Sequence, residues 1–241
     1  MFEDALRYPW AGEHRLETIL VGGVLTLLGV LFVPILVVYG YLVRVVRAVS
    51  AGDDAVPPAF DDWGELLVDG VVAFVVSFVY ALVPATFVTV AVLTFVIPVT
   101  VVGGTEVTQL PRTVAAGGVL LAILVAVLAV VVLLGALYLL PAALAAYAVT
   151  GRIASAFSPS TLRAIGGDGS YAIALIVALV IGFLAQVIGG LAAATVIGVL
   201  LVPFITFYGN VAAAYAIGIG VRDTPLVRQH REDSPSGQPA V

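Results

Sequence analysis

The chain lacks cysteine and lysine, and it has few charged residues of any kind. Charged types make up 10% of its 241 residues, whereas a soluble domain carries roughly a quarter. All ten basic residues are arginine and the net charge is −5, so there is no basic footprint for nucleic acid. Without cysteine, disulfides, zinc–thiolate sites and cysteine nucleophiles are excluded. With 62% hydrophobic residues and a mean hydropathy of +1.18, the composition indicates an integral membrane protein.

Four long blocks contain no charged residue and no histidine. A helix needs about 20 apolar residues to cross a hydrocarbon core of roughly 30 Å. The blocks are continuously apolar and show no alternation, which argues against a membrane barrel. We therefore expect an all-α, polytopic transmembrane helical bundle. The blocks are Thr18–Val43, Val71–Thr105, Thr113–Gly151 and Gly169–Val221.

The lengths of the blocks predict about five spans. The first block holds one helix, and the fourth holds two that are separated by a turn at Gly189-Gly190. The second and third blocks are each read as one long helix, tilted or kinked at Pro84, Pro98 and Pro141. A middle block that re-enters the membrane would raise the number to six or seven.

Arginine placement predicts the orientation of the chain in a cell membrane. With five spans, seven arginines share a side with the C-terminus and three lie opposite. The positive-inside rule then makes the C-terminus cytoplasmic and the N-terminus external. One further span near the N-terminus would move Arg7 and Arg15 to the inner side.

The domain organisation predicted from these patterns has three parts. Residues 1–17 mix charges with aromatic residues and form an amphipathic interfacial head or a frayed terminus. Residues 18–221 form a single transmembrane domain with an acidic loop at 50–69. Residues 222–241 are polar and contain proline, serine and glycine, which predicts a disordered cytoplasmic tail.

No recognisable catalytic, cofactor-binding or metal-binding pattern is found, so we expect no enzyme, cofactor or metal. His14 and His230 lie outside the apolar blocks, and catalysis within a membrane normally needs ionisable residues there. Gln186 and Asn210 are the candidate intramembrane polar contacts, because an unpaired amide is costly in hydrocarbon. We interpret them as structural glue between the last two helices, with a polar substrate path as the alternative.

Acidic residues gather in the loop after the first span: Asp53, Asp54, Asp61, Asp62, Glu65 and Asp69. We favour a salt-adapted surface over a divalent-cation site, because the spacing is not that of a calcium loop. The spacing of Asp62 and Glu65 is that of a capping box with aspartate as the cap. It predicts that a helix begins here, with Trp63 in the headgroup layer.

Small residues recur every fourth position in two places. Such spacing lets helices approach closely, so we predict packing within the monomer, with an oligomer face as the alternative. The candidate helix-packing residues are Gly190, Ala194 and Gly198, and a second set is Ala212, Ala216 and Gly220.

Several of these segments resemble a known family. They are Pro34–Tyr41 with Arg44 and Arg47, the loop with Pro57-Pro58 and Phe60-Asp61-Asp62-Trp63, and then Asp69-Gly70 and Tyr80–Pro84. In this order they resemble the domain-of-unknown-function 4013 family of integral membrane proteins, found mostly in archaea. The resemblance covers nearly the whole chain and implies the membrane class, but no activity, substrate or site. The absence of lysine and the excess of acid independently favour a halophilic source.

Two functions follow as hypotheses. The favoured one is a non-enzymatic membrane protein that interacts with lipids or with a membrane-protein partner, including a second copy of itself in a homo-oligomer. The alternative is a transporter or permease subunit for a small uncharged or apolar substrate. It draws on Pro34, Pro141 and Pro203, each followed by tyrosine five or six residues later, a type of repeat seen in transporters.

Overall fold

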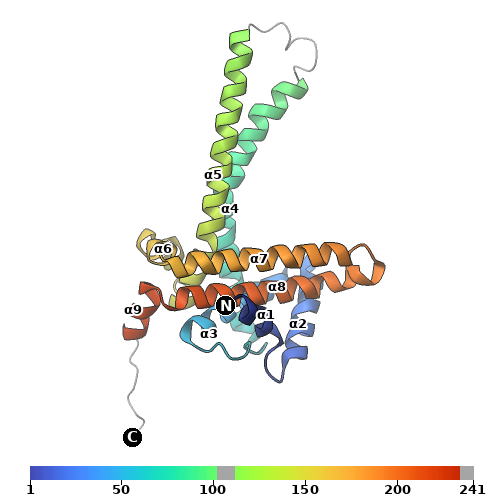
Figure 1. Cartoon of the computed structure of the whole chain (residues 1–241), viewed down its shortest axis with the longest axis vertical. Coiled ribbons are helices and arrows are strands. Elements are labelled where there is room, and N and C mark those ends of the chain that lie inside the picture. Colours follow the sequence, from blue (N-terminus) through green and yellow to red (C-terminus); the bar gives the residue numbers. More distant parts are fainter. Residues whose placement is uncertain (102–111, 234–241) are drawn as a thin grey trace. The chain divides into compact units, whose positions relative to one another are not determined.

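The computed structural model describes residues 1–101 and 112–233, and every regular element in these ranges is a helix (Figure 1). The predicted all-α class is therefore confirmed. The first elements are α1 (Phe2–Arg7), η1 (Tyr8–Trp10), α2 (Arg15–Leu27), η2 (Leu28–Leu31), α3 (Val33–Ala51) and α4 (Trp63–Val101). They are followed by α5 (Arg112–Thr150), η4 (Ile153–Phe157), α6 (Pro159–Gly166), α7 (Gly169–Ala192), α8 (Val196–Arg222) and α9 (Pro225–Asp233).

The chain divides into two compact units rather than the single domain that the sequence predicts. The first unit comprises Met1–Val76 and Pro141–Val241, and the second comprises Ser77–Leu140. Helices α4 and α5 contribute to both units because each is 39 residues long, or about 58 Å at 1.5 Å per residue. The prediction of one long helix in each middle block is thus confirmed within the described residues.

Five helices are long and apolar enough to cross a membrane, which equals the predicted number of spans. They are Val33–Ala51, Trp63–Val90, Leu120–Thr150, Gly169–Ala192 and Val196–Arg222. The bent pair Phe2–Trp10 and Arg15–Leu31, with an angle of 91°, would make a sixth.

The first apolar block differs from its prediction as one helix. It is divided among α2, η2 and α3 at Phe32, whose φ of 68° lies in the left-handed region. Pro34 stands in the first turn of α3, where its fixed φ and missing N–H fit a helix start. Because α3 then continues to Ala51, Arg44 and Arg47 lie inside a helix rather than after one.

The fourth block forms the antiparallel hairpin of α7 and α8, but its turn comes later than predicted. Gly189 and Gly190 are both helical, and the turn lies at residues 193–195. Thr195 caps α8 because its hydroxyl accepts the Gly198 N–H at 2.9 Å. The capping hydroxyl, not the glycine pair, therefore decides where the second helix begins.

Helices α3 and α4 touch backbone to backbone within the first unit. A Cβ added to Gly40 would overlap the Leu66 carbonyl oxygen, and one added to Gly70 would overlap the Leu36 carbonyl oxygen. Only glycine permits so close an approach.

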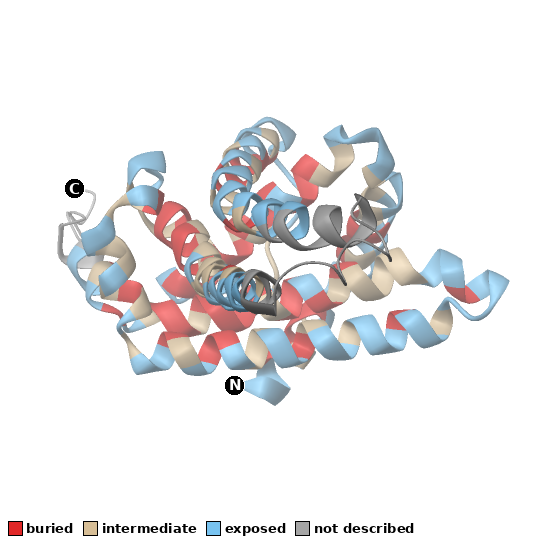
Figure 2. Cartoon of the chain, turned by 90° about the horizontal axis from the view of Figure 1, so that it is seen from above, coloured by how far each residue is buried: buried red, intermediate tan, exposed pale blue. Residues whose placement is uncertain are grey.

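On α8, the second predicted small set, Ala212, Ala216 and Gly220, is buried within the chain, and this supports the packing prediction. Figure 2 shows exposed residues at the α7–α8 turn and buried ones nearer the other end of α8.

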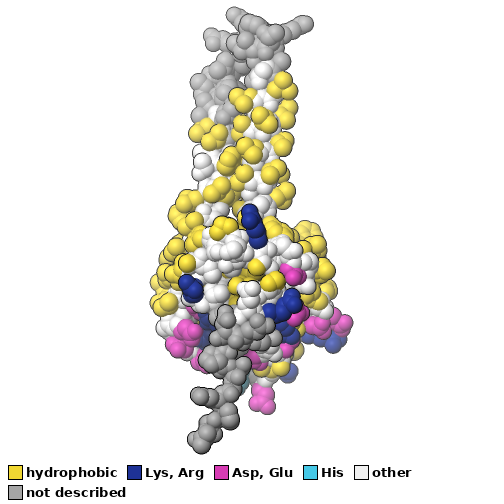
Figure 3. All heavy atoms as spheres, turned by 90° about the vertical axis from the view of Figure 1, so that its left-hand side faces the viewer, with side chains coloured by type: hydrophobic (Ala, Val, Ile, Leu, Met, Phe, Trp, Pro, Cys, Tyr) yellow, Lys and Arg dark blue, Asp and Glu magenta, His cyan; other side chains and the backbone are white. Residues whose placement is uncertain are grey.

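Apart from Arg112 at the start of α5, the charged residues of the described part all lie in the first unit. Figure 3 shows the described side chains of the second unit as hydrophobic and uncharged atoms.

The predicted disordered tail at 222–241 is wrong for its first half, because Arg222 ends α8 and α9 follows. Thr224 and Val227 are buried, which anchors α9, and residues 234–241 lie outside the described part.

Candidate functional site

A buried carboxylate joins three helices of the first unit. Asp69 on α4 is only 4% exposed and forms a two-pronged ion pair with Arg47 on α3, at 2.9 and 3.2 Å. Tyr147 on α5 donates its hydroxyl to the same carboxylate at 2.6 Å. Arg47 also donates Nε–H to the Ala148 carbonyl at 3.1 Å. Both charges are therefore paired and hydrogen-bonded, as buried charges must be.

A second arginine extends this cluster to the surface. Arg44, one turn before Arg47, pairs with Asp61 and, at 3.2 Å, with Glu65. Glu65 also meets Arg47 at 3.2 Å and so connects the two arginines. The Asp62 carboxylate accepts the Glu65 N–H at 3.2 Å, which confirms the predicted helix start. The Glu65 side chain does not turn back to the helix start as in a capping box. It pairs with Arg44 and Arg47 instead.

The loop between α3 and α4 is held against the helices rather than extended into solvent. The Tyr41 hydroxyl donates to the Pro58 carbonyl at 3.0 Å. Phe60 stacks on the Tyr41 ring with centroids 4.1 Å apart and also contacts Phe207 of α8 at 6.1 Å. The aromatic contacts and the backbone hydrogen bonds together fix the loop on the packed helices.

The N-terminal head packs on the same loop. The Tyr8 hydroxyl donates to the Val56 carbonyl at 3.2 Å, and the Tyr8 ring lies 4.4 Å from that of Tyr215 on α8. Burial, reinforced by the charge of Asp53, raises the pKa of Tyr8, so its hydroxyl remains a donor. These contacts put the head and the loop at one end of the unit. They contradict the five-span prediction that the two lie on opposite sides.

Arg222 ties the end of α8 to this same place. Its guanidinium pairs with Asp54 at 2.8 Å and donates to the Val49 carbonyl at 2.9 and 3.2 Å. The ends of α3 and α8, the start of α4 and the end of α5 thus meet at one charged end of the first unit. We call it the charged end.

The ion pairs of Arg44, Arg47 and Arg222 hold the helix ends together at the charged end, and we call this set of ion pairs the clasp. Asp54, Asp61, Glu65 and Asp69 each pair with an arginine. The prediction of a solvated acidic surface is wrong for Asp69, and Asp54, Asp61 and Glu65 are held in ion pairs. The sequence did carry a signal, because Arg47 and Asp69 are opposite charges just outside two apolar blocks on the same predicted side.

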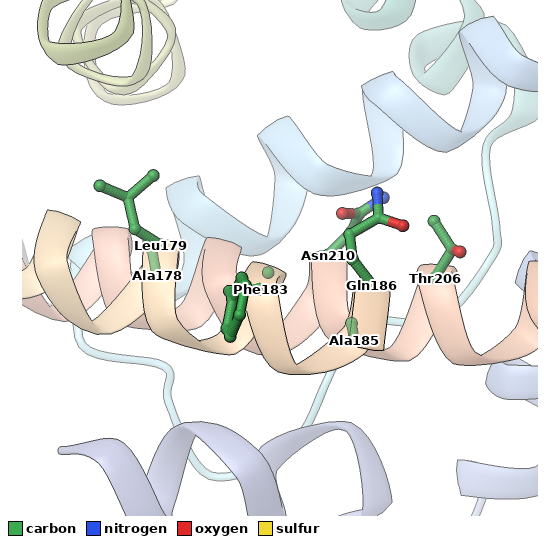
Figure 4. Close-up of a pocket in the computed structure, with 8 residues that line it drawn as sticks. Ala178, Leu179, Phe183, Ala185, Gln186, Thr206 and Asn210 are labelled. Carbon is green, nitrogen blue, oxygen red and sulfur yellow. The ribbon is translucent and has the colours of Figure 1, made fainter. Parts of the chain in front are cut away.

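The predicted polar pair lies elsewhere, on the α7–α8 hairpin. Gln186 and Asn210 line one groove of about 250 Å³ together with Thr206, and Figure 4 shows their side chains pointing to the same side. Both amides are exposed, and no hydrogen bond joins them in the described part of the chain. Within the first unit, the prediction that the Gln186 and Asn210 side chains face the interior of the hairpin is therefore wrong. The other lining residues are Ala178, Leu179, Gly182, Phe183 and Ala185.

The candidate packing residues Gly190, Ala194 and Gly198 do not share a helix. Gly190 lies in α7, Ala194 in the turn and Gly198 in α8, so they form no common stripe. The prediction failed because it placed the turn before Gly190. Gly198 packs instead on the end of α7, where an added Cβ would overlap the Ala192 carbonyl oxygen.

Comparison with known proteins bears on family alone. No curated protein and no solved structure matches the chain. A family model described as "Protein of unknown function (DUF4013)" matches residues 24–194, a stretch that holds Arg47, Asp69, Tyr147 and Gln186 but not α8. Because the match covers well over half of a chain whose five apolar helices suggest a multi-pass membrane protein, the chain belongs to the DUF4013 family.

Proposed function

We propose that the protein is a non-enzymatic, multi-pass membrane protein that binds a membrane-protein partner within the bilayer through the groove of Gln186, Thr206 and Asn210. One observation carries the proposal: two carboxamides are exposed partway along an apolar hairpin. Asn210 lies twelve residues before the end of α8, or about 18 Å along the helix.

The physical argument is the cost of an unpaired amide. In hydrocarbon such a group costs several kcal/mol, and polar side chains in membranes are therefore typically satisfied by a neighbouring helix. The groove holds neutral donors and acceptors and no charge, so it suits a partner with amide or hydroxyl groups. Support for a non-enzymatic role is that the lining of the groove includes no ionisable side chain and that four acids of the charged end pair with arginines.

Removing both amides should weaken partner binding about 100-fold and leave the fold intact. Because both side chains are exposed, Gln186→Leu with Asn210→Leu should change the free energy of unfolding by no more than about 0.5 kcal/mol. A photo-crosslinking amino acid at Leu179, introduced in the native host, should give one crosslinked protein. The yield of this adduct should fall about tenfold for each amide removed.

The matched control places the same crosslinker at Leu200, which is exposed outside the groove. It should give no discrete adduct. Equal adducts at Leu179 in the wild type and the double variant would refute the proposal. So would a large loss of stability in the double variant, since the amides would then be structural.

The second candidate, a transporter for a small uncharged substrate, is favoured by Pro203 within α8. Within the continuous helix, proline removes the hydrogen bond to the carbonyl four residues earlier, one turn before Thr206. Thr206→Cys distinguishes the two functions, because the chain has no other cysteine. If a partner covers the groove, a charged, water-soluble maleimide should leave the Thr206→Cys variant unlabelled. Rapid labelling would favour a water-filled path.

We also propose that the charged end faces the cytoplasm and that the Arg15–Leu31 segment inserts into the membrane as a sixth pass. The contact of Tyr8 with Val56 supports a shared side for the head and the loop. With six passes, nine arginines lie on the side of the C-terminus and Arg112 alone lies opposite. This bias is stronger than the seven-to-three ratio of the five-span topology.

Labelling of single cysteines tests this topology. In intact cells, an impermeant maleimide should label Ala194→Cys and Thr105→Cys, whereas Glu13→Cys and Ala55→Cys should react only after lysis. Thr105 lies outside the described residues, but its side follows from the number of passes. Labelling of Glu13→Cys in intact cells, with Ala55→Cys protected, would restore five spans and an external N-terminus.

A halophilic, archaeal source also remains a proposal. Its support is compositional: ten arginines, no lysine and fifteen acids, with acidic surfaces that hold water at high salt.

A further inference from the structure

The connector between α5 and α7, residues 151–168, lies where two candidate spans end. Helix α5 stops at Thr150 and α7 starts at Gly169, so the connector must sit at the level of the lipid headgroups. It is pinned there, because Ala156 and Ile165 are fully buried and the Ser155 hydroxyl donates to the Ala146 carbonyl at 3.1 Å.

Two arginines on this connector differ from four others in the first unit. Arg7, Arg44, Arg47 and Arg222 each pair with a carboxylate. Arg152 and Arg163 are exposed, and no ion pair is found for either among the side chains that the structure describes. Two exposed guanidinium groups at the headgroup level are available to an external anion.

The one acid of the connector does not neutralise them. Asp168 caps α7, where its carboxylate accepts the Ser170 N–H at 2.8 Å.

Exposed apolar side chains on the connector indicate that the anion belongs to a lipid and is not a soluble one. Ile153 is 49% exposed and Phe157 is 40% exposed, and both lie between Arg152 and Arg163 in the sequence. Exposed aliphatic and aromatic groups next to arginine are typical of segments in the headgroup layer, where the apolar part meets acyl chains and the cation meets phosphate.

We propose that Arg152 and Arg163 bind the phosphate groups of anionic phospholipids in the leaflet that covers the charged end. Guanidinium groups match phosphate geometry and donate two hydrogen bonds at once. The inference rests on the proposed membrane placement and is independent of the partner groove. Its consequence is that anionic lipid is bound at the connector, which would anchor the ends of α5 and α7.

Lipid retention measures the proposed site directly. The full chain is purified in neutral detergent, placed in nanodiscs of phosphatidylcholine with or without phosphatidylglycerol, and released into a mass spectrometer that counts retained lipids. Each basic residue near a membrane surface favours anionic lipid by about fivefold. Arg152→Gln with Arg163→Gln should therefore lower the preference for phosphatidylglycerol by about 25-fold.

The matched control is Arg7→Gln, which removes the same charge from an exposed arginine that already has an acid partner. It should keep the wild-type preference. Inorganic phosphate and glycerol phosphate, added in excess, should not displace phosphatidylglycerol, because they lack acyl chains. The thermal unfolding midpoint in phosphatidylcholine alone should be the same for all variants, since these side chains are exposed.

Three results would overturn the proposal: an unchanged lipid preference in the double variant, an equal loss in Arg7→Gln, or full displacement by free phosphate, which would indicate a soluble anion instead. Gln186→Leu with Asn210→Leu should keep the lipid preference. A failure of the lipid site therefore remains distinguishable from a failure of the partner groove.

Discussion

Replacing Asp69 with alanine should destabilise the protein by about 3 kcal/mol. The substitution leaves the Arg47 guanidinium without its two-pronged partner and the Tyr147 hydroxyl without its acceptor. Removing one member of a buried ion pair typically costs about 3–5 kcal/mol. We take the lower end because the Arg47 side chain is 32% exposed and still reaches Glu65.

Two further variants separate the charge from the packing. Asp69→Asn keeps an acceptor for Tyr147 but loses the ion pair, so it should cost about half as much. Arg47→Met with Asp69→Leu removes both charges at once. It should cost clearly less than the sum of the single changes, because no lone charge stays buried.

Unfolding by denaturant in mixed micelles, followed by tryptophan fluorescence, measures these effects. Asp53→Ala is the matched control, since Asp53 is an exposed acid of the adjoining loop. It should stay within about 0.5 kcal/mol of the wild type. If Asp69→Ala behaves like Asp53→Ala, the cluster does not hold the three helices together.

The sequence predicted the class of fold because the relevant signal is local. A run of apolar residues long enough to span a membrane is visible without any knowledge of the fold, and the long helices α4 and α5 follow from block length alone. The break at Phe32 is not visible in this way. Apolar residues continue through it from Thr18 to Val43, so periodicity and polarity give no sign of a change of direction.

The clasp could not be predicted because it depends on distance between helices. Arg47 and Asp69 are 22 residues apart and meet only because α3 and α4 come into backbone contact. The amides of the groove were found in the sequence, but their direction was not. Helix α8 is apolar on most sides, so its pattern does not say which face meets protein and which meets lipid.

Adding a single methyl group at the α3–α4 crossing should be as damaging as removing a charge. Gly40→Ala places a Cβ into the Leu66 carbonyl oxygen, and a backbone atom cannot move aside unless the helices separate. We expect a loss of about 3 kcal/mol, the upper part of the usual range for overpacking. Separation of the helices would also stretch the Arg44 and Arg47 ion pairs, which lie one and two turns further along α3.

Gly135→Ala on α5 is the control, because nothing lies within 4 Å of its added Cβ. Alanine is a better helix former than glycine by up to about 1 kcal/mol, so this variant should be neutral or more stable. The same chemical change is thus expected to have opposite signs at two helical glycines. Gly70→Ala should match Gly40→Ala, and the double variant should cost less than their sum, because both report one crossing. Equal thermal shifts for Gly40→Ala and Gly135→Ala would show that the backbones of α3 and α4 are not in contact.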